Sequence, residues 1–274
     1  MDPTSTLPDF EKPPVVETSL ALQFEPLPGL QTPQIGLLWS EFRESYPYTE
    51  QHPPIDPVFE TFGSRPKQRS NIDVTQSFPS PRCWFLDKER TQLIQIQQNQ
   101  FIHNWRKTDD VQIYPRYEVI RPQFKSEIER FVDFLTRENL GDLKPNQCEV
   151  AYTNHIMPGD VWESHSKLDQ VITMWKSEYS DDFLPPPENC RFSSQWIFYD
   201  DSDEPLGRLY ASVQPALLPR ENIPIFVLTL TARSRPHGSG VDGAFKSFDR
   251  GREMIVRGFK SITSEDMHKA WRSK

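Results

Sequence analysis

The sequence predicts an α+β fold of two similar units, each running strand, helix, several antiparallel strands, helix, with sheets continuous or packed together and helices on one face. Short runs of alternating apolar and polar residues predict the strands, and apolar residues three and four positions apart predict the helices. This order occurs once in residues 13–143 and again in residues 144–274. We therefore expect a doubled architecture, packed as one globule, although residue identity between the halves is low.

The first unit follows a polar, proline-bearing segment, residues 1–12, which we expect to be a flexible tail. Alternation between Val15 and Phe24 predicts the first strand. Thr32-Pro33 then opens a helix, with the threonine as its N-cap and the proline in its first turn, and apolar residues continue at helical spacing to Phe42.

The centre of the first unit is a glutamine-rich stretch. Between Leu93 and Trp105 the apolar residues recur with a period nearer two than 3.6. We therefore predict three antiparallel strands at residues 83–86, at residues 93–97 and ending near Arg106, rather than one helix.

A proline-rich stretch, residues 49–81, precedes these strands and has few periodic residues. A structureless run of this length is unusual inside a compact domain. Three interpretations stay open: a functional flap, an extended edge with a short strand near residues 72–78, or a partner-binding loop.

The remaining elements complete the first unit and build the second. Pro122 opens a helix that Asn139 and Gly141 end. Further elements are expected as a strand at residues 147–156, a helix at 161–179, strands at 192–199, 207–213 and 225–231, a helix at 242–259, and a short last helix capped by Ser264 or Thr263.

Composition restricts the function classes. A net charge of -8 argues against general nucleic-acid binding, because phosphate contacts need a basic face. No run approaches the roughly 20 apolar residues that a membrane-spanning helix requires, and the amino end does not resemble a signal peptide, so we expect a cytoplasmic protein. The three cysteines are widely separated, which argues against a disulfide framework and favours reduced, mostly buried thiols.

Residues 238–243 match the pattern GxGxxG between a predicted strand and a predicted helix. A dinucleotide site is excluded because no further strand with an acidic residue follows. Backbone amides at the start of this helix, with Arg233, Arg235 and His237 nearby, predict a weaker anion-binding site. The alternative is a glycine-containing loop with exposed arginines.

Catalytic and metal-binding patterns are absent from the sequence. It has no GxSxG, no P-loop lysine and no HExxH, and its six histidines have no short ligand spacing. We therefore assign no catalytic residue, no metal ligand and no cofactor. Enzymatic activity is not expected, although a site assembled from distant residues is compatible with the sequence.

A denser set of polar and aromatic residues surrounds the glutamine-rich strands. Arginines beside aromatic rings can stack and still bind a carboxylate or phosphate. The predicted ligand-binding residues are Trp105, Arg106, Arg116, Asn154 and His155. In the alternative interpretation the polar groups are satisfied and buried, with Arg106 or Arg116 paired with Glu17 or Glu149.

The chain resembles a sporadically distributed bacterial family of uncharacterised proteins. The resemblance spans nearly all of the chain after the amino-terminal segment. It is carried by residues 14–17, 23–27, Trp39, Tyr46-Pro47, 95–97, 104–106, 114–117, 152–156, Ile255-Val256, Phe259, Thr263, His268 and Trp271. The resemblance implies no fold or activity; the patchy occurrence of the family implies an accessory role in bacterial defence or conflict systems.

These observations predict a non-catalytic cytoplasmic protein that binds another protein or a second copy of itself. The predicted contact surface is the proline-rich loop or an exposed sheet edge. The alternative is a small-molecule or anion-binding module, or an unrecognised enzyme, with its pocket between the sheet and the helices.

Overall fold

The computed structural model describes residues 7–63, 80–109, 112–178, 181, 183–218 and 221–274. The strands are β1 (Val15–Phe24), β2 (Tyr48–His52), β3 (Arg82–Leu86), β4 (Gln92–Gln97), β5 (Gln100–Arg106), β6 (Pro145–Ile156), β7 (Phe192–Tyr199), β8 (Pro205–Leu217) and β9 (Pro224–Ser234). The helices are α1 (Thr32–Phe42), α2 (Tyr117–Arg137), α3 (Leu168–Val171), α4 (Gly240–Ile262) and α5 (Glu265–Ala270), with a 3₁₀ turn at His165–Lys167.

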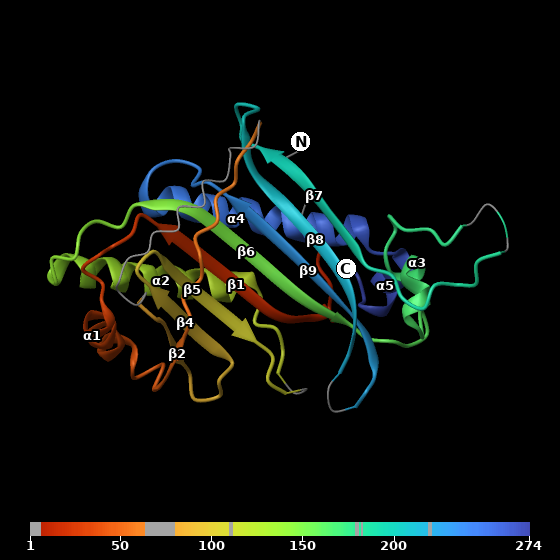
Figure 1. Cartoon of the computed structure of the whole chain (residues 1–274), viewed down its shortest axis with the longest axis horizontal. Coiled ribbons are helices and arrows are strands. Elements are labelled where there is room, and N and C mark those ends of the chain that lie inside the picture. Colours follow the sequence, from red (N-terminus) through yellow and green to blue (C-terminus); the bar gives the residue numbers. More distant parts are fainter. Residues whose placement is uncertain (1–6, 64–79, 110–111, 179–180, 182, 219–220) are drawn as a thin grey trace.

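These strands form one continuous nine-stranded sheet in the order β2-β3-β4-β5-β1-β6-β9-β8-β7 (Figure 1). Every pairing between neighbouring strands is antiparallel. The predicted α+β class with an antiparallel sheet is therefore confirmed. The central pair is β1 with β6, and a run of three consecutive strands lies on either side of it, β3 to β5 and β7 to β9.

The glutamine-rich stretch forms strands, as predicted. β4 and β5 pair so that Gln95 lies opposite Ile102 and Ile94 lies opposite His103. Because successive side chains of a strand point to opposite faces, Gln95 and Gln97 of β4 share one face, and Ile94 and Ile96 share the other. The isoleucines are fully buried beneath the helices.

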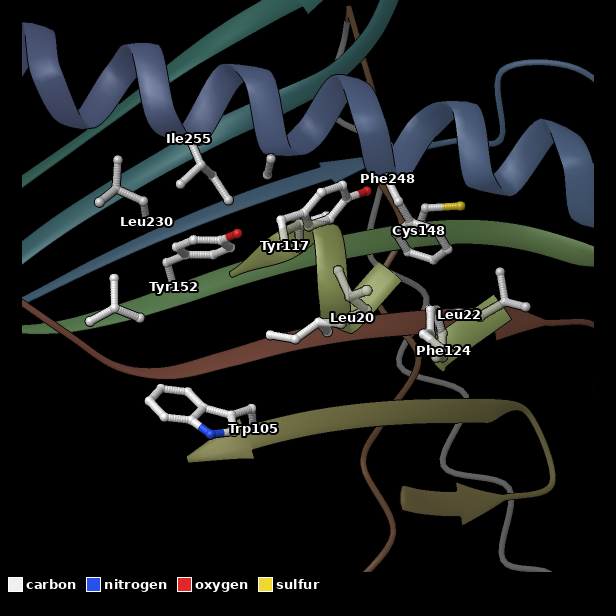
Figure 2. Packing of buried hydrophobic residues seen from close by; sticks show 14 of the residues in the cluster. Leu20, Leu22, Trp105, Tyr117, Phe124, Cys148, Tyr152, Leu230, Phe248 and Ile255 are labelled. Carbon is white, nitrogen blue, oxygen red and sulfur yellow. The ribbon is translucent and has the colours of Figure 1, made fainter. Parts of the chain in front are cut away.

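The hydrophobic core lies between the sheet and helices α2 and α4, which cover the same face (Figure 1). Figure 2 shows side chains of both halves meeting there: Leu20 and Leu22 from β1, Phe124 from α2, and Phe248 from α4. Each is fully buried, and burial of such a side chain contributes about 1.5–3 kcal/mol. The two halves therefore share one core.

The second helix begins earlier than Pro122. α2 starts at Tyr117, so the residues between Tyr117 and Pro122, which the prediction left out of the helix, are helical. Pro122 lacks the N–H that would bond to the carbonyl of Glu118, and one helical hydrogen bond is lost. The helix forms nonetheless because Tyr117, Ile120 and Phe124 bury their side chains on one side of it.

The helix predicted at residues 161–179 is wrong. In the described part of this range, residues 161–178, the helical elements are the 3₁₀ turn and the four-residue α3, and Ile172 instead makes an extended bridge with Thr263. Trp162, Leu168 and Ile172 are buried, so the apolar residues that suggested a helix anchor an irregular segment to the core. The helix near residue 32 also differs in detail, because its N-cap is Gln31 and no side chain caps it.

The amino-terminal segment is not a loose tail over its described part. Phe10 is only 5% exposed and makes edge-to-face contacts with Phe259 and Trp271. The backbone of Glu11 and Lys12 donates to the carbonyls of Arg272 and Trp271. The two ends of the chain therefore pair with each other beside α4 and α5.

Candidate functional site

The sheet has two chemically different faces. Helices α1, α2 and α4 cover one face; we call the other the front face, which Figure 1 presents to the viewer. Side chains on the front face of the central strands are small or polar, among them Ser19, Ala151, Thr153, Thr229 and Thr231, and all are partly exposed. A large sheet surface thus carries hydrogen-bonding groups rather than a second apolar core.

The five predicted ligand-binding residues divide between these faces. Trp105 and Asn154 lie on the helix-covered face and are 4% and 2% exposed. Arg106 directly follows Trp105 in β5, and His155 directly follows Asn154 in β6. Both therefore point to the front face. A single pocket lined by all five residues does not form, because neighbouring positions in a strand cannot share a face.

Arg116 and Asn154 do line a common cavity, of about 50 Å³, on the helix-covered side. Its wall includes Tyr114 and Tyr152, and the Tyr114 hydroxyl donates to the Tyr152 hydroxyl over 2.8 Å. Burial raises the pKa of both tyrosines, so both remain protonated. A space of this size accepts one or two waters, not a metabolite.

Arg116 has the unusual backbone angles φ 73° and ψ 155° directly before α2. This region is almost exclusive to glycine and costs a non-glycine residue about 1–3 kcal/mol. Its guanidinium binds the Asp9 carboxylate at 3.0 Å and donates to the carbonyls of Phe10 and Glu11. Arg116 therefore holds the amino-terminal segment, and it does not pair with Glu17 or Glu149.

Arg106 also lacks the expected carboxylate partner. Its Nε donates to the carbonyl of Arg90, and its guanidinium lies 5.9 Å from the centre of the Trp84 ring. Glu17 accepts instead from the Asn104 side chain. The interpretation of satisfied polar groups holds for these residues, but with different partners.

His155 lines a wide groove of about 620 Å³ at the end of the sheet, together with Lys12, Met157, Trp162 and Trp271. Burial and the nearby Lys107 lower the pKa of His155, so its imidazole is neutral at pH 7. The rim carries acidic as well as basic side chains. The groove therefore has no net preference for an anion.

Both arginines that were predicted to bind an anion are already paired with acidic side chains. Arg233 binds Glu149, with 2.7 Å between Nε and Oε2, and Arg235 lies 3.8 Å from Asp200. The pKa of Asp200 is lowered mainly by its hydrogen bond from the Glu204 backbone, with smaller contributions from Arg235 and His237. Anion binding at this place stays a prediction.

The GxGxxG turn has a structural reason for its last glycine. A Cβ on Gly243 would lie 2.5 Å from the carbonyl carbon of Gly238. The backbone N–H of His237 donates to the carbonyl of Gly243 and to the hydroxyl of Ser247. The turn therefore closes against the first turn of α4, and residue 243 must be glycine because no larger residue fits.

Part of the proline-rich loop crosses the front face. We call residues 53–62 the strap; in Figure 1 it runs in orange across the sheet from the end of β2 toward β8. Gln97 on β4 binds the strap backbone twice: its Oε1 accepts from Ile55 N at 2.9 Å and its Nε2 donates to Ile55 O at 2.8 Å. Gln23 on β1 accepts from Val58 N at 2.9 Å. The expected strand near residues 72–78 lies outside the described residues.

The strap ends in a buried carboxylate. The Glu60 side chain is 3% exposed and binds Arg208 at 2.5 Å, the Tyr210 hydroxyl at 2.7 Å and Arg233 at 3.5 Å. Although burial lowers the pKa of Arg208, the hydrogen bond that Arg208 donates to Glu60 raises this pKa above its ordinary value. Arg208 also donates to the carbonyl of Thr61. Two arginines thus bind a carboxylate on the front face.

The two edges of the sheet differ. β2 has five residues, carries Glu50 bound to Arg90 at 2.8 Å, and ends at Pro53-Pro54, which are all features that protect an edge strand. β7 has eight residues, FSSQWIFY, with no charge, proline or glycine. Among the described strands it pairs only with β8, and its Ile197 and Tyr199 are 41% and 44% exposed.

Comparison of the chain with protein-family models, with curated proteins and with solved structures finds no match. The resemblance to a bacterial family therefore stays a prediction. No helix among the described residues is long and apolar enough to cross a membrane. The described part of the chain also contains no cluster of three histidine, cysteine or acidic side chains that could hold a metal ion.

From the sequence we named Arg233 and the glutamine-rich stretch that contains Gln97, but we assigned no binding role to Gln23, Glu60 or Arg208. Glu60 and Arg208 are separated by 148 positions, and neither lies in a recognisable motif. The sequence signal that was available is the alternation of glutamines along β4, which places polar amides on one face of the sheet. Nothing in the sequence indicates that the strap returns to that face.

Proposed function

We propose that this chain is a non-catalytic protein-binding module that adds an extended segment of its partner to the free edge of β7. The observation that carries the proposal is the contrast between the two sheet edges. A long uncharged edge strand presents unpaired N–H and C=O groups, and natural proteins protect such strands unless they are used. Strand addition gives affinity through these groups and specificity through alternate side chains.

The described part of the proline-rich loop is less suited to capture a partner directly. Its backbone is already bound by Gln97 and Gln23, and Glu60 is buried. Of the two contact surfaces expected from the sequence, the structure therefore favours the sheet edge. On the front face of that edge, Ile197 and Tyr199 offer apolar contacts to a partner strand.

A second copy of the chain also fits this edge. Arg191 directly precedes β7, and Asp200 and Asp201 directly follow it. Two antiparallel β7 strands related by a two-fold axis would place the arginine of each copy beside the acidic turn of the other. Self-association is therefore one of the outcomes that the experiment distinguishes.

The test is Ile197→Lys, with Gln214→Lys on the neighbouring strand β8 as the matched control, because Gln214 is also exposed on the front face. Both changes add one lysine at the surface and are expected to change stability by less than about 1 kcal/mol. Wild-type protein and the control variant should co-purify with the same partner from the native host, or should form the same dimer in light scattering. The Ile197→Lys variant should lose this partner, or should no longer form the dimer.

The proposal fails if Ile197→Lys binds the partner as tightly as the control does. Loss of a partner that differs in mass from this chain identifies a hetero-complex, whereas loss of a dimer identifies self-pairing. In either case the edge is the contact surface.

The wider setting is part of the same proposal. A cytoplasmic accessory role in a bacterial defence or conflict system agrees with the sequence resemblance and with the lack of a membrane-crossing helix among the described residues. We also propose that the halves are equivalent units. Supporting this, β5-β4-β3 flanks β1 as β9-β8-β7 flanks β6, and a long helix follows each set.

A further inference from the structure

The strap is held to the sheet in an unusual way. Three of its apolar side chains, Ile55, Val58 and Phe59, remain 36%, 44% and 54% exposed, so none of them belongs to the hydrophobic core. Its contacts are instead backbone hydrogen bonds to Gln97 and Gln23. Backbone contacts of this kind do not depend on the side chains of the bound segment, so another extended segment could make them equally well.

Two side-chain contacts of the strap depend on its sequence. The Phe62 ring lies 4.7 Å from the Arg208 guanidinium, and the charged contact is made by the carboxylate of Glu60. If it left, Arg208 and Tyr210 would lose their partner, and Arg233 would keep only Glu149. The site would then carry one uncompensated positive charge in a partly buried position, which favours a replacement carboxylate. A carboxylate bound by two arginines and a tyrosine hydroxyl also has defined geometry.

Space exists between the strap and the sheet. A cavity of about 160 Å³ lies beneath Ile55 and Val58, and its floor includes Ala21 and Ile102. The strap therefore bridges the surface instead of packing into it. A bound segment with a larger side chain at the position of Val58 could use this volume.

We propose that the front face of the sheet is a binding surface for an extended acidic peptide, and that the strap is its resident occupant. The recognition rule follows from the contacts. Gln97 binds both the backbone N–H and the backbone C=O of one residue, and the arginine pair binds a glutamate five positions further along; in the strap these residues are Ile55 and Glu60. A partner segment with this spacing competes with the strap for the same site.

The experiment measures trans binding of a fluorescein-labelled peptide with the strap sequence PPIDPVFETF to the full chain. The variant Glu60→Gln weakens the resident strap, and Glu188→Gln, an exposed glutamate on the loop before β7, is the matched control. Hydrogen bonds to a buried charge imply a preference of about tenfold or more. The peptide should bind Glu60→Gln at least about tenfold more tightly than it binds wild type or the control.

Further arms establish where the peptide binds. The increase in affinity should disappear when the glutamate of the peptide is replaced by glutamine. It should also disappear in the double variant Glu60→Gln with Arg208→Gln. Adding Ile197→Lys should not change it, because this site is independent of the β7 edge. In wild type, hydrogen exchange at the amides of Ile55 and Val58 should accelerate when unlabelled peptide is added in excess.

Two results would overturn the proposal. One is equal peptide affinity for wild type, control and Glu60→Gln, which places the binding elsewhere or shows that there is none. The other is undiminished protection of the Ile55 and Val58 amides in Glu60→Gln, which means that the carboxylate does not hold the strap. Should Glu60→Gln not fold, the exchange measurement on wild-type protein with added peptide decides the question alone.

Discussion

Removal of the Glu127 carboxylate should destabilise the protein strongly, because this side chain joins α2 to the sheet inside the core. Glu127 is 4% exposed and accepts hydrogen bonds from the Tyr46 hydroxyl at 2.5 Å and from His103 Nδ1 at 2.8 Å. Burial, and after it the charge of Glu127, raises the pKa of Tyr46, so the tyrosine remains a donor. His103 is fully buried, and its Nε2 has no hydrogen-bond partner.

The magnitude follows from the donors that each substitution leaves without a partner. Glu127→Leu removes the acceptor of both Tyr46 and His103, and each unsatisfied buried donor costs about 1–3 kcal/mol, so we expect a loss of about 4 kcal/mol. Glu127→Gln keeps an acceptor for Tyr46 but presents an N–H to His103. The imidazole proton must then move to Nε2, which has no partner, and the expected loss is about 2 kcal/mol.

Equilibrium unfolding in urea measures these losses, with an unchanged m-value as the check that the denatured state is the same. Glu129→Gln on the exposed side of the same helix is the matched control and should lose less than about 0.5 kcal/mol. Nitrogen NMR should show the His103 proton on Nδ1 in wild type and on Nε2 in Glu127→Gln. A Glu127→Leu variant within about 1 kcal/mol of wild type would refute the account of this cluster.

Two further predictions concern Arg116 and His268, which both contact the amino-terminal segment. Arg116→Ala should be less stable than Arg116→Gly by about 1 kcal/mol, since both lose the contacts to Asp9 but only glycine tolerates φ 73°; equal urea midpoints would show that the backbone is not strained. His268 has its pKa lowered by burial and by Lys260, so the unfolded state binds its proton more readily and stability should fall as pH drops below about 6.5. His268→Gln should show a shallower fall between pH 7.5 and 5.5 in thermal unfolding, and an identical slope would contradict this assignment.

Local patterns predicted most of the sheet. The period-two alternation around Gln95 distinguished strands from a helix, because side-chain alternation along a half-buried strand is fixed by backbone geometry. The same rule could have corrected the predicted pocket. Trp105 and Arg106 are adjacent in one strand, as are Asn154 and His155, so each pair must point to opposite faces.

Other features lie beyond local patterns. The apolar residues from Trp162 to Ile172 have helical spacing, yet most of this segment is irregular. Their side chains can be buried without a helix, because burial requires only that each side chain reaches the core. The contact of Glu60 with Arg208 depends on where the strap lies in three dimensions. No nearby residue signals it, and only a structure places this carboxylate beside its arginines.

The central claim is that the outer edge of β7 is free in the isolated chain and is filled in the complex. Hydrogen exchange of the β7 backbone amides, measured for the purified chain alone at low concentration and then with the partner that depends on Ile197, tests it most directly. The account predicts fast exchange at alternate residues of Phe192–Tyr199 in the isolated chain and strong protection of those amides in the complex. Protection of every β7 amide without a partner, or exchange unchanged by binding, would contradict it.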